Sequence, residues 1–357
     1  MKSRIALAAA AVLAVVLAAC GADDSSAVTD STGAPSDVTL TLLAYDSFTP
    51  SDGIFDAFTE RTGIHVEVAQ AGDAGAMVSK AVLTAGNPEG DVMWGVDNTL
   101  LSRAIDGDVF SPYESPALGD VPAELSALVP GHEATPVDYG DVCVNYDVAA
   151  LEAAGVAPPQ TLDDLADPRY ADMLVVENPV TSSPGLAFLL ATIGAKGDGW
   201  KDYWSALRDN GVKVVDDWDT AYYTDFTRAG GDRPLVVSYA SSPPAEVVYA
   251  DPPLAEGAPA PTAIAAGTCF RQVEFAGVLR GTDHEAEARQ LVDYLAGPAF
   301  QADLPLTMFV YPANDTVALP DVFQQYSTPI TDAFSVDPAE IAANRQQWID
   351  DWTTVVL

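Results

Sequence analysis

The sequence predicts an α/β fold of two lobes with a ligand cleft between them. Strands and helices alternate in two separate sets along the chain, and two long β-like runs without a following helix connect these sets. Residues 38–357 also exceed what a single hydrophobic core usually organises. Two lobes joined by two crossing strands are the plan of a hinged binding protein.

The first set of elements has the order strand, helix, strand, helix, strand. Hydrophobic periodicity predicts a strand at residues 38–44, a helix after residue 54, a strand at 64–68, a helix at 76–83 and a strand at 91–96. This order predicts a parallel sheet with helices on both faces. No glycine fingerprint for phosphate follows the first strand, so a nucleotide-binding Rossmann site has little support.

The second set lies between the two crossing runs. The runs are residues 136–146 and 268–279; between them we expect strands at 173–177, 211–215 and 235–239 and a helix at 185–193. We therefore assign residues 38–140 plus 271–316 to lobe 1, residues 141–270 to lobe 2, and residues 317–357 to a C-terminal helical segment. In that segment Trp348 and Trp352 fall at helical spacing, which favours a role in the core or in covering a lobe.

The N-terminus predicts export and a lipid anchor. Lys2 and Arg4 precede an apolar run at residues 5–19, which stops at a small-residue cleavage site before Cys20. About fifteen apolar residues are too few to span a bilayer, which needs roughly 20. We read residues 1–20 as a lipoprotein signal peptide, Cys20 as the lipidated residue, and residues 21–37 as a flexible linker. A secreted protein that carries this cysteine by chance is the alternative.

The charge is strongly acidic. Sixteen Lys and Arg stand against 52 Asp and Glu, for a net charge of −36. Such a surface repels nucleic acid and anionic lipid, so we expect no nucleic-acid partner. It attracts cations, although a surface that serves only solubility explains the same composition.

Cys143 and Cys269 remain after the signal peptide, one in each crossing run. An oxidising compartment and an even count favour a disulfide, with two buried free thiols as the alternative. The three histidines (His65, His132 and His284) are isolated, so a metal site has poor support and none is predicted.

Polar and aromatic motifs stand at the predicted strand ends, where open α/β sheets present ligand-binding groups. In chain order they are YDSF at 45–48, GVDN at 95–98, VDYG at 137–140, TSSPG at 181–185, WDTAY at 218–222, SYASSP at 238–243 and YPAN at 311–314. This ordered set resembles the thiamine-binding proteins of bacterial thiamine ABC transporters. The resemblance implies a type II periplasmic-binding-protein fold and the function of a receptor, not an enzyme, with thiamine as the transported ligand and no cofactor.

The resemblance also implies a set of ligand-binding residues and partners. The residues at the family's positions are Tyr45, Asp73, Ala74, Ser182, Ser183, Trp218, Tyr239, Ala240, Ser241, Ser242 and Phe309. The implied ligand is a small cation, thiamine, and by extension its phosphates. The implied protein partner is the membrane permease of the importer, and we expect the receptor to act as a monomer.

The chemistry of these residues agrees with a flat organic cation. Aromatic faces such as Trp218 attract a cation, and a carboxylate such as Asp73 neutralises charge or accepts from an amine. Hydroxyls at Ser182 and Ser183, ahead of a helix, suit a hydroxyl or phosphate end. Each residue also has a structural explanation: a turn for Asp73, loop packing for Trp218, a core lid for Tyr239 and a helix cap for the serines.

Three positions depart from the family pattern. Ala245 stands where members often carry a second cleft tyrosine, Phe309 where they carry tryptophan, and the polar pair at 51–52 where another tryptophan is expected. Tyr222, Tyr223, Tyr249 and Trp94 are candidates to compensate. These departures bear on the preference for phosphate esters and on the tightness of binding.

Other functions remain as alternatives. A receptor of the same fold for a polyamine or an iron complex is the runner-up, although the isolated histidines give no iron-binding pattern. A hydrolase needs a nucleophile beside a base, and no G-x-S-x-G elbow surrounds Ser182 and Ser183.

Overall fold

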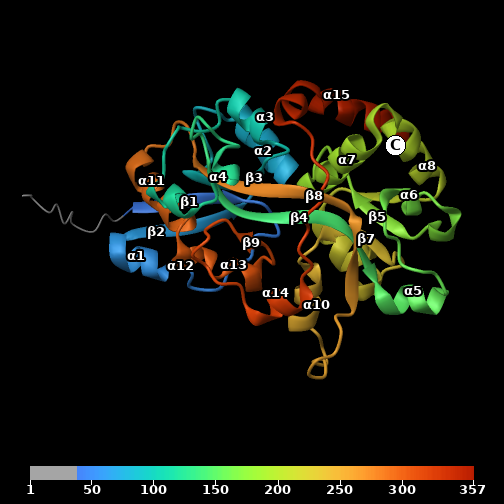
Figure 1. Cartoon of the computed structure of the whole chain (residues 1–357). Coiled ribbons are helices and arrows are strands. Elements are labelled where there is room, and N and C mark those ends of the chain that lie inside the picture. The colour runs from blue at the N-terminus through green and yellow to red at the C-terminus, as the bar shows by residue number, and fades with distance from the viewer. Residues whose placement is uncertain (1–37) are drawn as a thin grey trace, which may run out of the picture. The chain divides into compact units, whose positions relative to one another are not determined.

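The computed structural model describes residues 38–357. The predicted signal peptide, the lipidated Cys20 and the linker therefore lie outside the described residues. Within residues 38–357, no helix is long and apolar enough to cross a membrane. The chain forms one mixed sheet of nine strands with helices packed on it, which confirms the α/β class (Figure 1).

The first part of the sheet is parallel, as predicted. Its strands are β1 (Val38–Ala44), β2 (Ile64–Gln70) and β3 (Val92–Asp97), and β1 pairs with both others. The connecting helices are α1 (Asp56–Thr62) and α2 (Ala74–Leu83). Gly63 ends α1 in the left-handed conformation (φ 74°), which glycine adopts without steric penalty.

The two crossing strands, β4 (Thr135–Asp147) and β8 (Thr262–Val278), run antiparallel to each other through the middle of the sheet (Figure 1). The strand order is β2-β1-β3-β8-β4-β7-β5-β6, with β9 (Tyr311–Pro312) paired to β4. We call β1–β3 the first half of the sheet and β5–β7 the second half. β8 joins β3 of the first half to β4, and β4 joins β7 of the second half.

The second half is again parallel. Its strands are β5 (Leu174–Glu177), β6 (Lys213–Val215) and β7 (Leu235–Tyr239), and β5 pairs with the other two. Helix α7 (Ser183–Lys196) packs against this half and is buried from Ser183 to Ile193, because that stretch is mostly apolar on all sides.

The remaining helices cover the sheet or connect its strands. They are α3 (Leu101–Asp106), α4 (Ala123–Ser126), α5 (Val148–Ala154), α6 (Leu162–Leu165), α8 (Trp200–Asp209), α9 (Trp218–Thr220), α10 (Ser242–Val248), α11 (Glu285–Leu295), α12 (Pro298–Gln301), α13 (Leu304–Thr307), α14 (Asp321–Tyr326) and α15 (Pro338–Val356). Helix α15 contacts both α3 and α8, and Figure 1 shows it lying across these elements. Trp352 on α15 is fully buried and packs edge-on against Trp204 of α8, which confirms its predicted core role.

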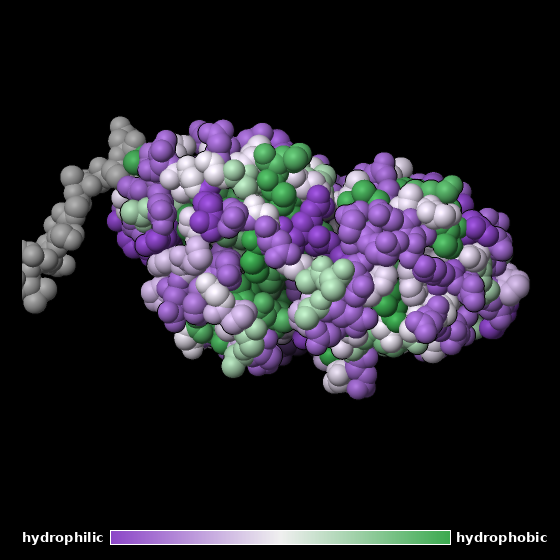
Figure 2. All heavy atoms as spheres, turned by 90° about the horizontal axis from the view of Figure 1, so that it is seen from above, coloured by the Kyte–Doolittle hydropathy of each residue, from purple (hydrophilic) through white to green (hydrophobic). Residues whose placement is uncertain are grey.

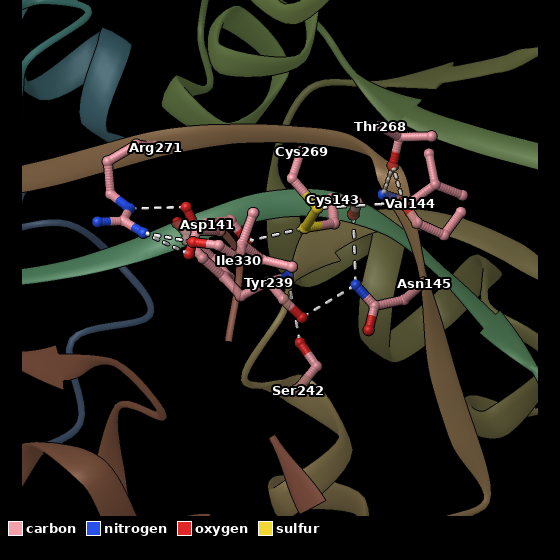
Figure 3. The surroundings of a disulfide bond; sticks show 11 residues. Asp141, Cys143, Val144, Asn145, Tyr239, Ser242, Thr268, Cys269, Arg271 and Ile330 are labelled. Carbon is pink, nitrogen blue, oxygen red and sulfur yellow. Dashed lines mark hydrogen bonds and ion pairs between the residues drawn. A yellow bond between two sulfur atoms is a disulfide. The ribbon is translucent and has the colours of Figure 1, made fainter. Parts of the chain in front are cut away.

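A disulfide joins Cys143 of β4 to Cys269 of β8, as predicted (Figure 3). The pairing of these strands shifts register between Val142 and Val144, so β8 carries an extra loop there. The hydroxyl of Thr268 stabilises this loop by accepting from Val144 N at 2.9 Å and donating to Ala265 O at 2.7 Å. Strand β8 therefore begins at Thr262, earlier than the predicted residue 268, because the bulge interrupts the alternation.

Candidate ligand-binding cleft

A cavity of about 210 Å³ lies where elements of the two halves of the sheet meet. Its walls come from the residues after β1, the start of α2, the start of α7, helix α9, the end of β7 with α10, and the segment after α13. Most are strand ends or helix starts, which is where an open α/β sheet presents free backbone groups.

Most of the predicted ligand residues line this cavity. They are Tyr45, Asp73, Ala74, Ser183, Trp218, Tyr239, Ser242 and Phe309. Ser182, Ala240 and Ser241 are buried and do not line it. Ala240 packs instead against the disulfide, because the residue after Tyr239 turns to the opposite side of the chain.

An aromatic wall forms one side of the cavity. Trp218 stacks on Tyr222 with ring centroids 5.0 Å apart and an interplanar angle of 17°, and Tyr223 meets Trp218 edge-on. The indole Nε1 of Trp218 donates to Ser238 Oγ at 3.0 Å, which fixes the ring orientation. A flat ligand therefore finds a preorganised stacking surface.

Tyr45 lies opposite, at the end of β1. Its hydroxyl donates to Glu274 Oε2 at 3.0 Å. The ring fits because residue 95 is glycine: a Cβ at that position would lie 2.3 Å from the Tyr45 ring, and Gly95 has a positive φ of 92°. The GVDN motif at 95–98 therefore makes room for an aromatic side chain at the cleft.

Asp73 connects the two sides of the cleft. It is the N-cap of α2, accepting from Ala74 N at 2.5 Å, and its other oxygen accepts from Trp218 N at 3.2 Å. Burial raises the pKa of Asp73 to about 6, although both backbone hydrogen bonds favour the charged form. The carboxylate thus positions Trp218 as well as facing the cavity.

Acidic residues at the floor of the cleft were not predicted from the sequence. Glu274 on β8 lines the cavity, and Asp138 on β4 and Asp97 on β3 lie directly opposite it in the strand register. Asp97 and Asp138 belong to motifs noted above, but only the register of the crossing strands places Glu274 beside them. In the sequence, the only indication was an acidic residue within each of the two long crossing runs.

The compensating aromatics divide into two groups. Tyr222 and Tyr223 line the cavity, while Trp94 is fully buried in the core and Tyr249 packs against Phe309 from outside, with centroids 5.6 Å apart. Phe309 adopts a positive φ of 53°, a strained conformation for an aromatic residue. Ala245 lines the cavity and presents only a methyl group there.

Comparison with known proteins decides the family. Residues 87–334 match the family of bacterial extracellular solute-binding proteins. The protein belongs to this family.

Similar proteins extend over nearly the whole chain. The thiamine-binding periplasmic proteins of Salmonella typhimurium and Escherichia coli are each 29% identical over 331 residues, which cover 89% of this chain and 93% of theirs. A solved periplasmic thiamin-binding protein superposes with a TM-score of 0.77 at 28% identity, over 89% of this chain and 96% of its own. These likenesses confirm the type II periplasmic-binding fold.

The surface of this solute-binding protein is largely hydrophilic on the face shown in Figure 2, with scattered hydrophobic patches. This agrees with the acidic composition. Among the described residues, no Lys, Arg or His lines the cavity, whereas Asp46, Asp73, Asp219 and Glu274 do. The electrostatic potential in the cavity is therefore negative, which favours positively charged solutes.

The contact of α2 with the segment before α7 in this solute-binding protein depends on a glycine. Ala76 N of α2 donates to Thr181 O, ahead of α7, at 3.2 Å, and a Cβ on Gly75 would lie 2.3 Å from that oxygen. We expect Gly75→Ala to separate α2 from residue 181 and to increase the radius of gyration measured by small-angle X-ray scattering. Thermal stability should change little, because the gain of about 1 kcal/mol from alanine as the better helix former offsets a lost hydrogen bond of about the same size. Gly119→Ala, which meets nothing within 4 Å, is the control and should change neither.

Proposed function

We propose that the protein is the extracytoplasmic receptor of an ABC importer, that it binds thiamine, and that it delivers this ligand to a membrane permease. The observation that carries the proposal is the cavity itself, which combines an aromatic wall with carboxylates and has no basic side chain among its described lining residues. Thiamine combines a flat aminopyrimidine with a fixed thiazolium charge. The aromatic wall therefore matches its flat rings, and the carboxylates match its positive charge. The likeness to thiamine-binding periplasmic proteins supports the same ligand.

In the proposed complex each wall has its own role. Trp218, stacked on Tyr222, provides an aromatic face for the cationic ring, a contact that stabilises by roughly 0.5–2 kcal/mol depending on desolvation. Asp73 accepts from the exocyclic amine, and Tyr45, Tyr239 and Phe309 close the remaining sides. Ser183 at the start of α7 and Ser242 face the hydroxyethyl end.

Thiamine phosphates are a secondary ligand in this proposal. The N-terminus of α7, with Ser183, offers backbone N–H groups to an anion. However, the negative lining opposes a phosphate group. We therefore propose that the unphosphorylated vitamin binds best.

The location and assembly form part of the proposal. We propose that Cys20 carries a lipid that anchors the mature protein to the membrane, that residues 38–140 with 271–316 and residues 141–270 are the two lobes, and that the receptor works as a monomer. It has no catalytic role, requires no cofactor and binds no nucleic acid. The family membership and the acidic charge support these points.

Titration calorimetry of the mature protein tests the ligand. We expect thiamine to bind with a Kd below about 10 µM and more tightly than thiamine monophosphate, thiamine diphosphate or spermidine. Tighter binding of spermidine would favour the polyamine alternative. No measurable binding of thiamine would refute the assignment.

The site is tested by substitution at both sides of the cleft. Trp218→Ala and Asp73→Asn should each weaken thiamine binding by roughly 1–3 kcal/mol, through loss of the stacking face and of the charged acceptor. Trp218→Phe keeps an aromatic face and should recover much of the loss. Unchanged affinity in Trp218→Ala would show that the ligand binds elsewhere.

A further inference from the structure

Three acidic residues form a row across the floor of the cleft. In the antiparallel register, Glu274 of β8 lies opposite Asp97 of β3 on one side and opposite Asp138 of β4 on the other. Directly opposite residues in antiparallel strands point to the same face, with Cβ atoms about 4.5–5.5 Å apart. All three are buried, with exposed fractions of 0% for Asp97, 4% for Glu274 and 1% for Asp138.

The three carboxyl groups differ in their hydrogen bonds. Asp97 accepts from the backbone N–H groups of Thr99 and Leu100, from the Thr99 hydroxyl and from Gln272 Nε2. Glu274 accepts from the Tyr45 hydroxyl at 3.0 Å. Both carboxyl oxygens of Asp138 are buried without a hydrogen-bond partner. Burial raises the pKa of Asp97, but these hydrogen bonds favour its ionised form, a support that Asp138 lacks and that Glu274 has only from Tyr45.

No basic side chain among the described residues forms an ion pair with this row; the basic group near it is Arg345 of α15, which is largely buried and lies within electrostatic range of Asp97 but not of Glu274 or Asp138. None of the three acids takes part in a described ion pair. The groups that face Glu274 are Tyr45 after β1, Asp97 on β3, Asp138 on β4, Asp73 before α2 and Tyr239 on β7, all acidic or neutral. Arg271, a near neighbour on β8, is bound to Asp141 at 2.6 Å beside the disulfide (Figure 3).

Two adjacent buried carboxyls without a counter-charge retain a proton. Burial and the neighbouring charge of Asp97 raise the pKa of Glu274 to about 8, and burial and Glu274 raise that of Asp138 well above its ordinary value. Before a ligand enters, this pair of carboxyl groups therefore holds at least one exchangeable proton near neutral pH. Because Glu274 lines the cavity, a cation that enters comes close to this proton.

We propose that Glu274, paired with Asp138, is the specificity-determining counter-charge of the cleft, and that a bound organic cation replaces a proton there. The proton leaves to solvent as the cation enters, so the net charge of the closed cleft is the same before and after binding. A neutral molecule of the same shape cannot make this exchange. This inference rests on the proposed function and adds to it how the charge is recognised.

Calorimetry of thiamine binding in buffers of different ionisation enthalpy measures the released protons directly. We expect about 0.5–1 proton released per thiamine at pH 7, and an association constant that rises by up to about tenfold per pH unit between pH 6 and pH 8. The sign follows from the raised pKa: at lower pH more of the pair is protonated, and more work is needed to displace that proton. Thiochrome, a neutral fused derivative of thiamine, should bind weakly and release no proton.

Glu274→Gln should remove most of the proton release and lower thiamine affinity at pH 8 by about tenfold or more, while its affinity at pH 6 changes less. Glu177→Gln is the matched control: this carboxyl is also fully buried and unpartnered but does not line the cavity, so release should persist. Far-ultraviolet circular dichroism checks that both variants are folded. Thiamine binding without proton release, or with release unchanged in Glu274→Gln, would overturn this inference alone. Absence of thiamine binding to the wild type would overturn the proposed function as well.

Discussion

Replacing both cysteines of the crossing strands by alanine is expected to lower the free energy of unfolding by about 5 kcal/mol. The bond between Cys143 and Cys269 closes a loop with a sequence separation of 126. In the chain-entropy description, a cross-link of that span restricts the unfolded chain by about 5 kcal/mol at 25 °C. Urea denaturation of the oxidised wild type and of the double variant measures the difference.

The wild type in a reducing buffer provides the control for this experiment. Its midpoint should move to that of the double variant, because both lack the cross-link. Equal midpoints for oxidised wild type and double variant would show that the bond adds no stability. The Arg271–Asp141 ion pair remains in both and does not contribute to the comparison.

Trp352→Ala is expected to destabilise the protein by about 3–5 kcal/mol, the usual effect of emptying a buried aromatic position. Trp352 is fully buried and packs against Trp204 with ring centroids 5.4 Å apart. Helix α15 contacts α8, which lies with the second half of the sheet, and α3, which follows β3 of the first half. Loss of this side chain therefore loosens the packing of α15 on α8, one of the two helices that α15 contacts.

Thermal unfolding followed by calorimetry measures the effect of Trp352→Ala. Trp348→Ala is the matched control: it lies one turn earlier on the same helix and is only partly buried, so a much smaller loss is expected. A loss at Trp348 as large as at Trp352 would contradict the packing described for α15.

Most of the elements could be predicted because their periodicity is local. The predicted strands at 38–44 and 235–239 coincide with β1 and β7. The start of β8 could not be predicted, because residues 262–265 become a strand only by pairing with β4 beyond the bulge. The sequence likewise could not show that one sheet continues through both halves, because this depends on pairing between strands that are distant in the chain.

The cleft residues that could be predicted are those with an aromatic or capping residue at a strand end. Trp218, Tyr239 and Asp73 all belong to this group. Glu274 could not be assigned to the cleft from the sequence, because it is a single acidic residue within a long strand. Only the pairing of β8 with β3 and β4 brings it beside Asp97 and Asp138. Ala240 and Ser241 follow the same motif as Tyr239 but turn away from the cavity.

The pairing of β3 with β8 has a consequence for the order in which the protein folds. Val92 of β3 pairs with Val278 of β8. The sheet formed by β1 to β3 can therefore pair with β8 only after the ribosome has added the whole intervening segment. Contacts between residues so far apart in sequence form slowly. The half of the sheet that is synthesised first is therefore completed late, and its unpaired edge at β3 stays available to chaperones, or to aggregation, until β8 arrives.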